Sequence, residues 1–377
     1  MSSIRLRFDE FAEMVNDRVD NPADSGLSRY VGLEHLDPGV IRISRTGSTD
    51  DVGTTKFRFR AEDVIYARRN PHLRKAGLAD FDGIASAHSL VLRAVSTVCT
   101  PEYLANFLIS ATFSKRAMAI SVGSLSRTIN WRDLRVQEFD LPSLDEQRRV
   151  VEVMRAVDRA IEVAEAIVAA ANSAITALVP PKGPPRKLSQ IVDVALGISL
   201  SKERRDGSMT MFPYLRAANV SNGIFSMEDI KSMGMTEEES AQAAVAPRDV
   251  LMAEGGDSDK VGLPAWVPEV IPPNLKMQNS ILRLRTKNEQ VVSQRFVYWI
   301  CKWFGAAGGF ERVATGTKVK HLSLQGLRQI ELPIADPGAQ ATHVETADAL
   351  SRVLEGGSTT VQRAQALRAS LLQELIG

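Results

Sequence analysis

Residues 141–178 read LPSLDEQRRVVEVMRAVDRAIEVAEAIVAAANSAITAL, and this stretch decides how the whole chain is organised. Its apolar side chains recur at alternating spacings of four and three residues, at Val150, Met154, Val157, Ile161, Ala164, Val168, Ala171, Ile175 and Leu178. An average spacing of about 3.5 residues keeps one stripe of a helix turned toward a partner helix along its whole length. The pattern therefore predicts a long coiled-coil helix near the middle of a 377-residue chain.

The composition is that of an ordinary globular protein with more than one domain. A chain of 377 residues is longer than one hydrophobic core usually serves, and 44% of its residues are apolar and 24% charged. No apolar signal segment opens the chain, and we expect no membrane span. Cys99 and Cys301 stand far apart without a CxxC pair, so we expect free thiols and a cytoplasmic protein. The net charge is +1, with mildly acidic helical regions and a mildly basic remainder.

The first 143 residues contain short elements of both kinds. Alternating or continuous apolar runs bounded by turn residues predict strands, and apolar residues at spacings of three and four predict helices. Helices are expected over 8–19 and 101–118, and strands over 30–36, 40–44, 57–59, 64–66 and 89–93.

The second half repeats the first. The proline-rich segment 180–185 ends the central helix, because proline cannot continue one. Matching segments then follow in the same order at offsets of 184 to 191: 30–31 with 214–215, 62–65 with 248–251, 75–78 with 260–263, 89–93 with 280–284, and 139–142 with 330–333. An ordered series at about half the chain length indicates a tandem duplication.

A second helical region follows the second repeat. Residues 336–377 keep the same apolar alternation, but Gly356, Gly357 and Arg368 interrupt it. Glycine in a helix interior costs roughly 1 kcal/mol relative to alanine, so we expect this helix to be kinked or loose unless the central helix supports it.

These patterns predict an α+β fold: two similar mixed α/β domains separated by an antiparallel coiled coil of two long helices. The expected boundaries are 1–143 for the first domain, 144–180 for the central helix, 181–335 for the second domain and 336–377 for the C-terminal helix.

Several motifs resemble those of the DNA specificity (S) subunits of type I restriction–modification systems. The most specific is Leu141-Pro142-Ser143-Leu144-Asp145-Glu146-Gln147, which runs directly into the heptads. The others are residues 253–257 with 260–262, residues 278–280, and Gly316-Thr317-Lys318 followed by Leu322-Ser323. The resemblance covers essentially the whole chain and identifies the two domains as target recognition domains.

One departure from the family pattern affects the second helix. Where the first half has Leu-Asp-Glu-Gln at 144–147, the second has Ala335-Asp336-Pro337-Gly338-Ala339-Gln340. The glutamine is kept and the acidic pair is lost. We therefore expect the second helix to begin differently from the first, which leaves open whether the two halves hold partner subunits with equal strength.

The resemblance implies a non-catalytic subunit that reads double-stranded DNA for an adenine methyltransferase complex. Each domain would read one half of a bipartite target, and a helix over 145–178, roughly 50 Å at about 1.5 Å per residue, would set the gap. The implied partners are two methylation subunits and, optionally, a restriction or translocase subunit. No cofactor is expected on this chain, whereas S-adenosylmethionine, ATP and Mg are expected on the partners.

Catalytic signatures are absent from the sequence. No Asp/Asn-Pro-Pro-aromatic segment is present to hold a flipped adenine, since Pro272-Pro273-Asn274 has the wrong order. No Gly-x4-Gly-Lys-Ser/Thr phosphate loop occurs, and the five histidines lack the spacing of metal ligands. Residues 304–308 only faintly resemble a methyl-donor glycine loop, because they follow a helix candidate and no strand.

Basic and amide side chains in loops are the DNA-binding candidates. Arginine and lysine contact phosphates, while bidentate arginine, asparagine and glutamine contacts read base edges. In the first domain the candidates are Arg68, Arg69, Asn70, His72, Arg74, Lys75 and Arg127. In the second they are Lys202, Arg204, Arg205, Lys260, Gln278, Lys318, Lys320 and His321. Each one alone could equally be a solvated surface charge.

The coiled coil supplies the candidate partner-binding positions. These are Leu144, Gln147, Val150, Met154, Val157, Ile161, Val168, Ile175, Leu354, Val361 and Leu371. Two alternatives to DNA specificity in a type I system stay open. One is a coiled-coil scaffold that reads no DNA, and the other is the recognition subunit of a different nuclease–methyltransferase system.

Overall fold

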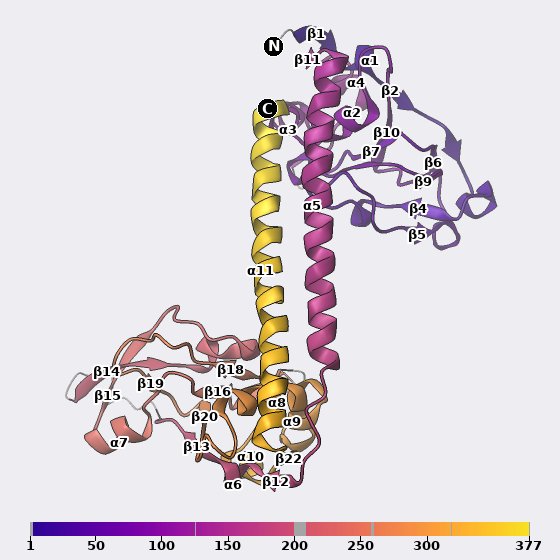
Figure 1. Ribbon diagram of the computed structural model, residues 1–377. Helices are drawn as coiled ribbons and strands as arrows, with labels where there is room; N and C mark the ends of the chain where they lie inside the picture. Colours follow the sequence, from indigo (N-terminus) through magenta and orange to yellow (C-terminus); the bar gives the residue numbers. More distant parts are fainter. Residues whose placement is uncertain (1–2, 125, 200–208, 258–259, 318, 377) are drawn as a thin grey trace. The chain divides into compact units, whose positions relative to one another are not determined.

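A computed structural model of the chain describes residues 3–124, 126–199, 209–257, 260–317 and 319–376. The chain divides into two compact units, residues 1–166 with 357–377 and residues 167–356. Two long helices, α5 (Leu144–Ala177) and α11 (Pro337–Ile376), each contribute a segment to both units. Within each unit the two segments pack antiparallel (Figure 1).

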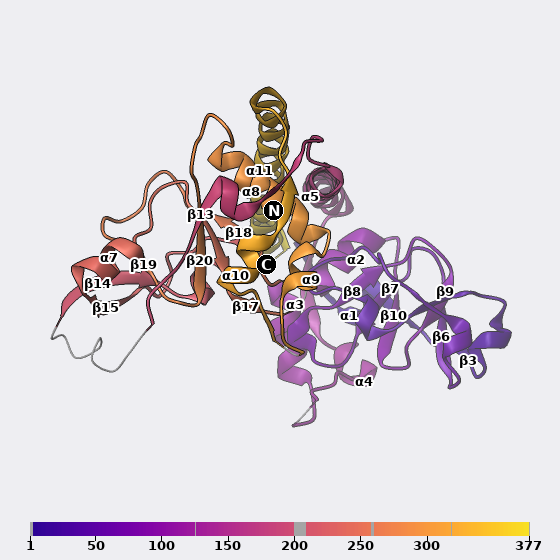
Figure 2. The same ribbon diagram turned by 90° about the horizontal axis from the view of Figure 1, so that it is seen from below.

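The first unit is built on a four-stranded antiparallel sheet in the order β2-β10-β7-β8. These strands are Ala12–Val15, Ser89–Ala94, Val64–Ala67 and Ala76–Leu78. Helix α2 (Pro101–Leu108) contacts this sheet beside β7 and β8 (Figure 2). The core beneath it is rich in phenylalanine, with Phe8, Phe11, Phe107, Phe113 and Phe139 packed mainly edge to face. This aromatic cluster joins the sheet to the first turns of α5.

Further short elements complete the first unit. β1 (Ser3–Arg7) pairs antiparallel with β11 (Glu138–Pro142), which leads directly into α5. A second sheet has the order β3-β6-β9-β4-β5, in which β4 and β9 are parallel. Its strands are Arg18–Val19, Lys56–Phe59, Gly83–Ala85, Arg29–Val31 and Gly47–Ser48. The remaining helices are α1 (Phe8–Phe11), α3 (Ala111–Ile120) and α4 (Trp131–Leu134).

The second unit repeats this frame. Its main sheet has the order β13-β20-β16-β18, formed by Val192–Leu196, Ile281–Thr286, Val250–Ala253 and Pro264–Trp266. β12 (Pro185–Lys187) pairs with β22 (Glu331–Pro333) before α11, as β1 pairs with β11 before α5. Helices α6 (Leu188–Ile191), α8 (Gln294–Ala306), α9 (Gly309–Val313) and α10 (Leu324–Gln329) take the places of α1 to α4.

The second sheets of the two units differ. In the second unit the order is β15-β14-β19, formed by Lys231–Met235, Thr210–Leu215 and Lys276–Met277, and α7 (Glu237–Gln242) follows β15. The parallel pair β14 and β19 corresponds to β4 and β9, with Tyr214 beside Lys276 as Tyr30 lies beside Ile84. The strands added around that pair are different. A further short pair joins β17 (Gly255–Gly256) to β21 (Lys320–His321).

Several local predictions were wrong. The helix expected over 8–19 lasts only one turn, because residues 12–15 instead pair with β10 as β2. Residues 40–44 form no strand and are held by a single bridge between Arg42 and Leu78. The strand over 30–36 ends at Val31, after which the Gly32 amide donates to Nδ1 of His35 and a 3-10 turn begins. The helix over 101–118 is two helices, since Ser110 caps α3 by accepting from the Phe113 amide.

The C-terminal helix is continuous from Pro337 to Ile376, so the kink or loosening expected at Gly356-Gly357 for an unsupported helix does not occur. Packing at both ends outweighs the glycine cost: Ala347 is buried in the core of the second unit, and Leu372 and Ile376 in the core of the first. Arg368 does not break the seam either, because its guanidinium is buried and donates to Asp158 of α5 at 2.5 Å.

Helix α5 is also long and apolar enough to cross a membrane by length and composition alone. Within the first unit, however, Val150 and Met154 lie in the protein core, and within the second Ile175 and Leu178 pack against the core. The core helix of a soluble protein can pass the same test of length and composition.

Candidate nucleic-acid interface

Equivalent buried carboxylates hold the two main sheets in the same way. Asp63 accepts from the Arg60 amide at 2.9 Å and pairs with the Arg93 guanidinium at 2.7 and 2.8 Å. Its side chain is 1% exposed. The hydrogen bond to Asp63 raises the pKa of Arg93 despite partial burial. A left-handed residue, Glu62 at φ 71°, precedes this aspartate.

The second unit repeats every part of that arrangement. Asp249, 2% exposed, accepts from the Ala246 amide at 2.7 Å and pairs with Arg285 at 2.8 and 2.7 Å. Arg248 precedes it with φ 69°. The turn before β7 and the turn before β16 therefore have the same structure, and an ion pair ties each turn to the neighbouring strand. As a result, β7 and β16 are held in the same way in the two units.

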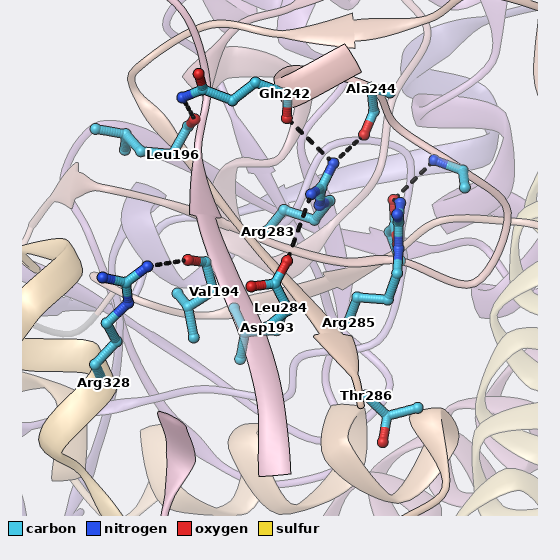
Figure 3. A network of polar contacts seen from close by, with 12 residues as sticks. Asp193, Val194, Leu196, Gln242, Ala244, Arg283, Leu284, Arg285, Thr286 and Arg328 are labelled. Carbon is cyan, nitrogen blue, oxygen red and sulfur yellow. Dashed lines mark hydrogen bonds and ion pairs between the residues drawn. The ribbon is translucent and has the colours of Figure 1, made fainter. Parts of the chain in front are cut away.

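Figure 3 shows a second, buried arginine, Arg283, beside Arg285 on the same strand. Arg283 of β20 donates to the carbonyl oxygens of Gln242 and Ala244 and lies 3.9 Å from the Asp193 carboxylate. Burial, and then the positive charge of Arg285, lower the pKa of Arg283. Its contacts tie the main sheet to the segment after α7, so they position the second sheet of this unit.

The segment that continues from β7 carries most candidates of the first unit. The Asn70 amide donates to the Arg127 carbonyl at 2.7 Å, the Ile129 amide donates to the Arg68 carbonyl at 2.9 Å, and Arg69 forms a β-bridge with Thr128. The structure thus brings Arg68, Arg69, Asn70 and Arg127 together.

The remaining first-unit candidates lie on the turn that follows. Asn70 and Arg74 both have left-handed backbone, at φ 52° and 49°. His72 and Arg74 are exposed, whereas the Lys75 ammonium donates to the Leu33 carbonyl at 3.0 Å. The turn therefore presents His72 and Arg74 to solvent and uses Lys75 for an internal contact.

Two basic residues near this cluster were missed by sequence reasoning. His88 has its carbonyl bound by the Arg68 amide at 3.2 Å, and its pKa is lowered first by partial burial and then by Arg69, Arg68 and Lys56. Lys56 is 8% exposed, and burial lowers its pKa. The shift on His88 indicates a locally positive region. No sequence pattern pointed to either residue, because each is a single basic residue, Lys56 on β6 and His88 in the turn before β10.

The candidates of the second unit are only partly brought together. Lys320 and His321 form β21 and pair with Gly256 and Gly255. Lys260 lies nearby and pairs with Asp257 at 3.2 Å. Gln278 lies apart, where its amide donates to the Leu215 carbonyl at 2.9 Å beside the parallel pair. Lys202, Arg204, Arg205 and Lys318 lie outside the described residues.

The two long helices begin in the same way, contrary to expectation. Gln147 accepts from the Thr100 amide at 3.0 Å and donates to the carbonyls of Val98 and Pro142. Gln340 accepts from the Ser293 amide at 3.1 Å and donates to the carbonyls of Val291 and Ala335. Pro337-Gly338 leaves this arrangement intact, since Asp336 accepts from the Ala339 amide as Ser143 accepts from the Glu146 amide. The loss of the acidic pair is thus confined to the exposed face.

The predicted seam positions all lie on the covered side of their helices. Gln147, Val150 and Met154 are buried. The others are partly buried: Leu144, Val157, Ile161, Val168, Ile175, Leu354, Val361 and Leu371. Apolar side chains also stand exposed elsewhere on the helices, at Val153, Val163, Ile167, Val353 and Leu367.

Both cysteines are buried free thiols, and burial raises the pKa of each to about 12. Among the described residues, no three His, Cys, Asp or Glu side chains gather in a way that could hold a metal ion.

Comparison with known proteins agrees with this architecture. Residues 30–172 match the family model of the type I restriction modification DNA specificity domain. The type I restriction enzyme EcoDI specificity subunit of Escherichia coli is 25% identical over 172 residues, which cover 45% of this chain. The matched stretch spans 37% of that relative's length.

Solved structures share the fold over the whole chain. A type I restriction–modification S subunit from M. genitalium has a TM-score of 0.62 at 15% identity, covering 100% of this chain and 96% of that one. The HsdS subunit from Thermoanaerobacter tengcongensis has a TM-score of 0.50 at 18% identity, covering 99% and 96%. The predicted fold class, two mixed α/β domains with long antiparallel helices, is confirmed.

The repeated main sheets and the paired long helices define a modular protein of two similar units. Residues 30–172 match the type I restriction modification DNA specificity domain, and the whole chain shares its fold with solved S subunits of type I restriction–modification systems.

Proposed function

We propose that this chain selects the DNA sequence at which a type I adenine methyltransferase complex acts, with each unit reading one half of a bipartite double-stranded target. The observation that carries the proposal is the duplication. Two copies of one frame, each with basic side chains beside the strand that follows its buried aspartate, suit a target with two separate halves.

The long helices supply the unread gap in this proposal. α5 has 34 residues and α11 has 40, so at about 1.5 Å per residue they extend roughly 50 and 60 Å. Recognition modules joined by such a spacer would read two short sequences and leave the base pairs between them unread. The length of the spacer, and not the chemistry of the loops, would then fix the gap.

The partners are also part of the proposal. Two methylation subunits would supply S-adenosylmethionine and the site for the flipped adenine, and a restriction subunit, where present, would supply ATP and Mg. The exposed apolar residues Val153, Val163 and Ile167 on α5 support a partner surface. Acting on chromosomal DNA, the complex would work in the cytoplasm.

The test is to lengthen both helices by one heptad, after Ala166 in α5 and after Gly356 in α11, so that their pairing is kept. One heptad adds about 10.5 Å, or about 3 base pairs at 3.4 Å each. Methylome sequencing of cells expressing the chain with its neighbouring methyltransferase should then show unchanged half-sites and a longer gap.

The matched control replaces one existing heptad by another of the same apolar pattern, which should leave both half-sites and gap as they are. Altered half-sites at an unchanged gap would refute the spacer role. No dependence of the methylome on this chain, together with intact complex assembly, would favour the alternative of a scaffold that reads no DNA. If the chain alters the methylome only when it is expressed with a methyltransferase from another kind of system, the third alternative is favoured, a recognition subunit of a different nuclease–methyltransferase.

A further inference from the structure

Each unit contains a part that is the same in both units and a part that differs between them. The main sheets β2-β10-β7-β8 and β13-β20-β16-β18 have the same order and the same carboxylate–arginine pair. The second sheets share only the parallel pair, around which the first unit adds β3, β5 and β6, and the second adds β15. Two half-sites of different sequence can be told apart only by the parts that differ.

A hairpin belongs to the shared part. In the first unit, Val122 and Thr128 exchange backbone hydrogen bonds of 3.0 and 2.8 Å. In the second, Thr315 and His321 exchange bonds of 3.0 and 2.7 Å. Each hairpin is joined to the strand that continues from β7 or β16, through Thr128 with Arg69 and through His321 with Gly255.

The two hairpins also share a conformation that requires glycine. Gly123 has φ +104° and Gly316 has φ +105°. A Cβ would lie 2.9 Å from the Ser126 carbonyl oxygen in the first hairpin and 2.2 Å from that of Val319 in the second. Because only glycine adopts this conformation without strain, the glycine that follows the first paired residue has the same backbone conformation in both hairpins.

A basic residue occupies the same place in each hairpin, directly before the closing residue. Arg127 is exposed, and its guanidinium donates only to the Met118 carbonyl, at 3.2 Å. Lys320 is partly exposed. Neither side chain pairs with a carboxylate among the residues that the structure describes. A cation on a rigid loop without an acidic partner is suited to a DNA phosphate.

Resting on the proposed function, we propose that Arg127 and Lys320 are matched phosphate contacts, one in each unit, that set the register of each domain on the duplex without reading sequence. Base reading then falls to the second sheets, where the units differ. The geometry repeats in both halves, as a contact with the regular phosphate backbone would. The neighbouring Arg68 and Arg69 in the first unit, against Glu254 and Gly255 in the second, make the first contact the stronger of the two.

The test uses the full chain in complex with its methyltransferase and two duplexes of equal length, one with the methylome-derived target and one unrelated. Each of Arg127→Ala and Lys320→Ala should lower the affinity for the target duplex and for the unrelated duplex by the same factor, and that factor should be larger for Arg127→Ala. Each should also reduce the slope of log K against log[KCl] by about 1, and the double variant by about 2. The half-sites in the methylome should not change.

Two controls accompany these variants. Arg127→Lys and Lys320→Arg keep the charge and should keep the slope. Arg5→Ala removes a similarly exposed guanidinium of β1 that is already paired with Glu138, and should leave the slope unchanged. Because Arg127 is exposed with one hydrogen bond of 3.2 Å to the Met118 carbonyl, and Lys320 is partly exposed, the melting temperatures of the alanine variants should stay close to that of the parent chain.

An unchanged slope in both alanine variants overturns the inference, as does a loss of affinity confined to the target duplex, which would make these residues base readers. The proposed function fails separately, if the parent complex binds both duplexes equally. In that case the salt slopes of the parent and the alanine variants are still compared on the unrelated duplex. A smaller slope in the variants would support the phosphate contacts without supporting the proposed function.

Discussion

At the scale of single residues, the buried aspartates of the main sheets are the most consequential side chains outside the loops. Asp63 and Asp249 each accept a backbone amide and a two-pronged arginine pair while nearly free of solvent. Their arginine partners, Arg93 and Arg285, are 43% and 42% exposed. The two members of each pair therefore differ in what their removal leaves behind.

We predict an asymmetric effect of removing either member. Arg93→Met leaves a buried carboxylate without its cation and should cost about 3 kcal/mol, whereas Asp63→Asn leaves an arginine that water can reach and should cost less, about 2 kcal/mol. Hydrogen exchange should report this as a roughly hundredfold faster exchange in β7 and β10 for Arg93→Met.

The matched variant Arg285→Met serves as the control, since it should accelerate exchange in β16 and β20 and leave the first unit protected. Equal effects of Arg93→Met and Asp63→Asn would contradict the argument from burial.

At the scale of elements, each unit fastens its long helix to the helix that follows its main sheet, but with reversed charge. In the first unit Arg155 of α5 pairs with Glu102 of α2. In the second, Asp348 of α11 accepts from Arg295 of α8 at 2.8 Å. Arg155 and Asp348 are separated by the same number of residues as Gln147 and Gln340, and so are Glu102 and Arg295. The two ion pairs therefore occupy equivalent positions in the two units.

The second of these ion pairs is the better supported. Asp348 also accepts from the Trp299 indole at 2.7 Å, and the Arg295 guanidinium lies 4.5 Å from the centre of the Trp266 ring. Both members are about a quarter exposed, against 54% for Arg155. Cation–π contact and lower exposure each strengthen a pair of this kind.

Reversing one charge should destabilise, and reversing both should restore stability. We expect Glu102→Arg to cost about 1 kcal/mol and Asp348→Arg about 2–3 kcal/mol. The double variants with Arg155→Glu and Arg295→Glu should recover most of each loss. Double-mutant cycles from denaturant unfolding measure the two coupling energies. Glu102→Gln is the neutral control. A coupling near zero in the second unit would contradict the assignment of Arg295 and Asp348 as an anchor.

The elements also mark what sequence alone could predict. Regular heptads fixed α5, and the family motif Leu141–Gln147 identified the fold, because long periodic patterns and helix starts are local signals. The helix expected over 8–19 failed because a partner strand distant in sequence, β10, decides the fate of residues 12–15. The continuity of α11 could not be foreseen either, since it depends on burial of its two ends in the two cores and on the contact of Arg368 with Asp158.

The same limit applies to the candidate interface. Arg68, Arg69 and Asn70 were adjacent in sequence and easily found, but their contact with Arg127 depends on a tertiary β-bridge. The equivalence of the two hairpins was also hidden, because residues 122–128 and 315–321 share little beyond one glycine. What they share is a backbone torsion, which leaves almost no trace in side-chain identity.

At the scale of the whole molecule, the two units differ in how they use the chain. The unit of residues 167–356 is continuous, and its core includes Ile175, Leu178, Val344 and Ala347 from its own segments of the long helices. The unit of residues 1–166 needs residues 357–377 in addition. One unit can therefore be complete on its own, while the other depends on both ends of the chain.

We predict that the fragment 167–356 folds alone and melts cooperatively, whereas the fragment 1–166 is destabilised until a peptide of residues 357–377 is added. The peptide would restore the buried side chains Leu372 and Ile376, worth about 1.5–3 kcal/mol each, and the Arg368–Asp158 pair. Circular dichroism melts of 1–166 should shift upward with peptide concentration, as expected for a ligand that binds only the folded state. A peptide with Arg368→Met and Leu372→Ala is the matched control and should produce little shift. Identical melts of 1–166 with and without the native peptide would show that α11 contributes nothing to the first unit, and would contradict the assignment of its last turns to that core.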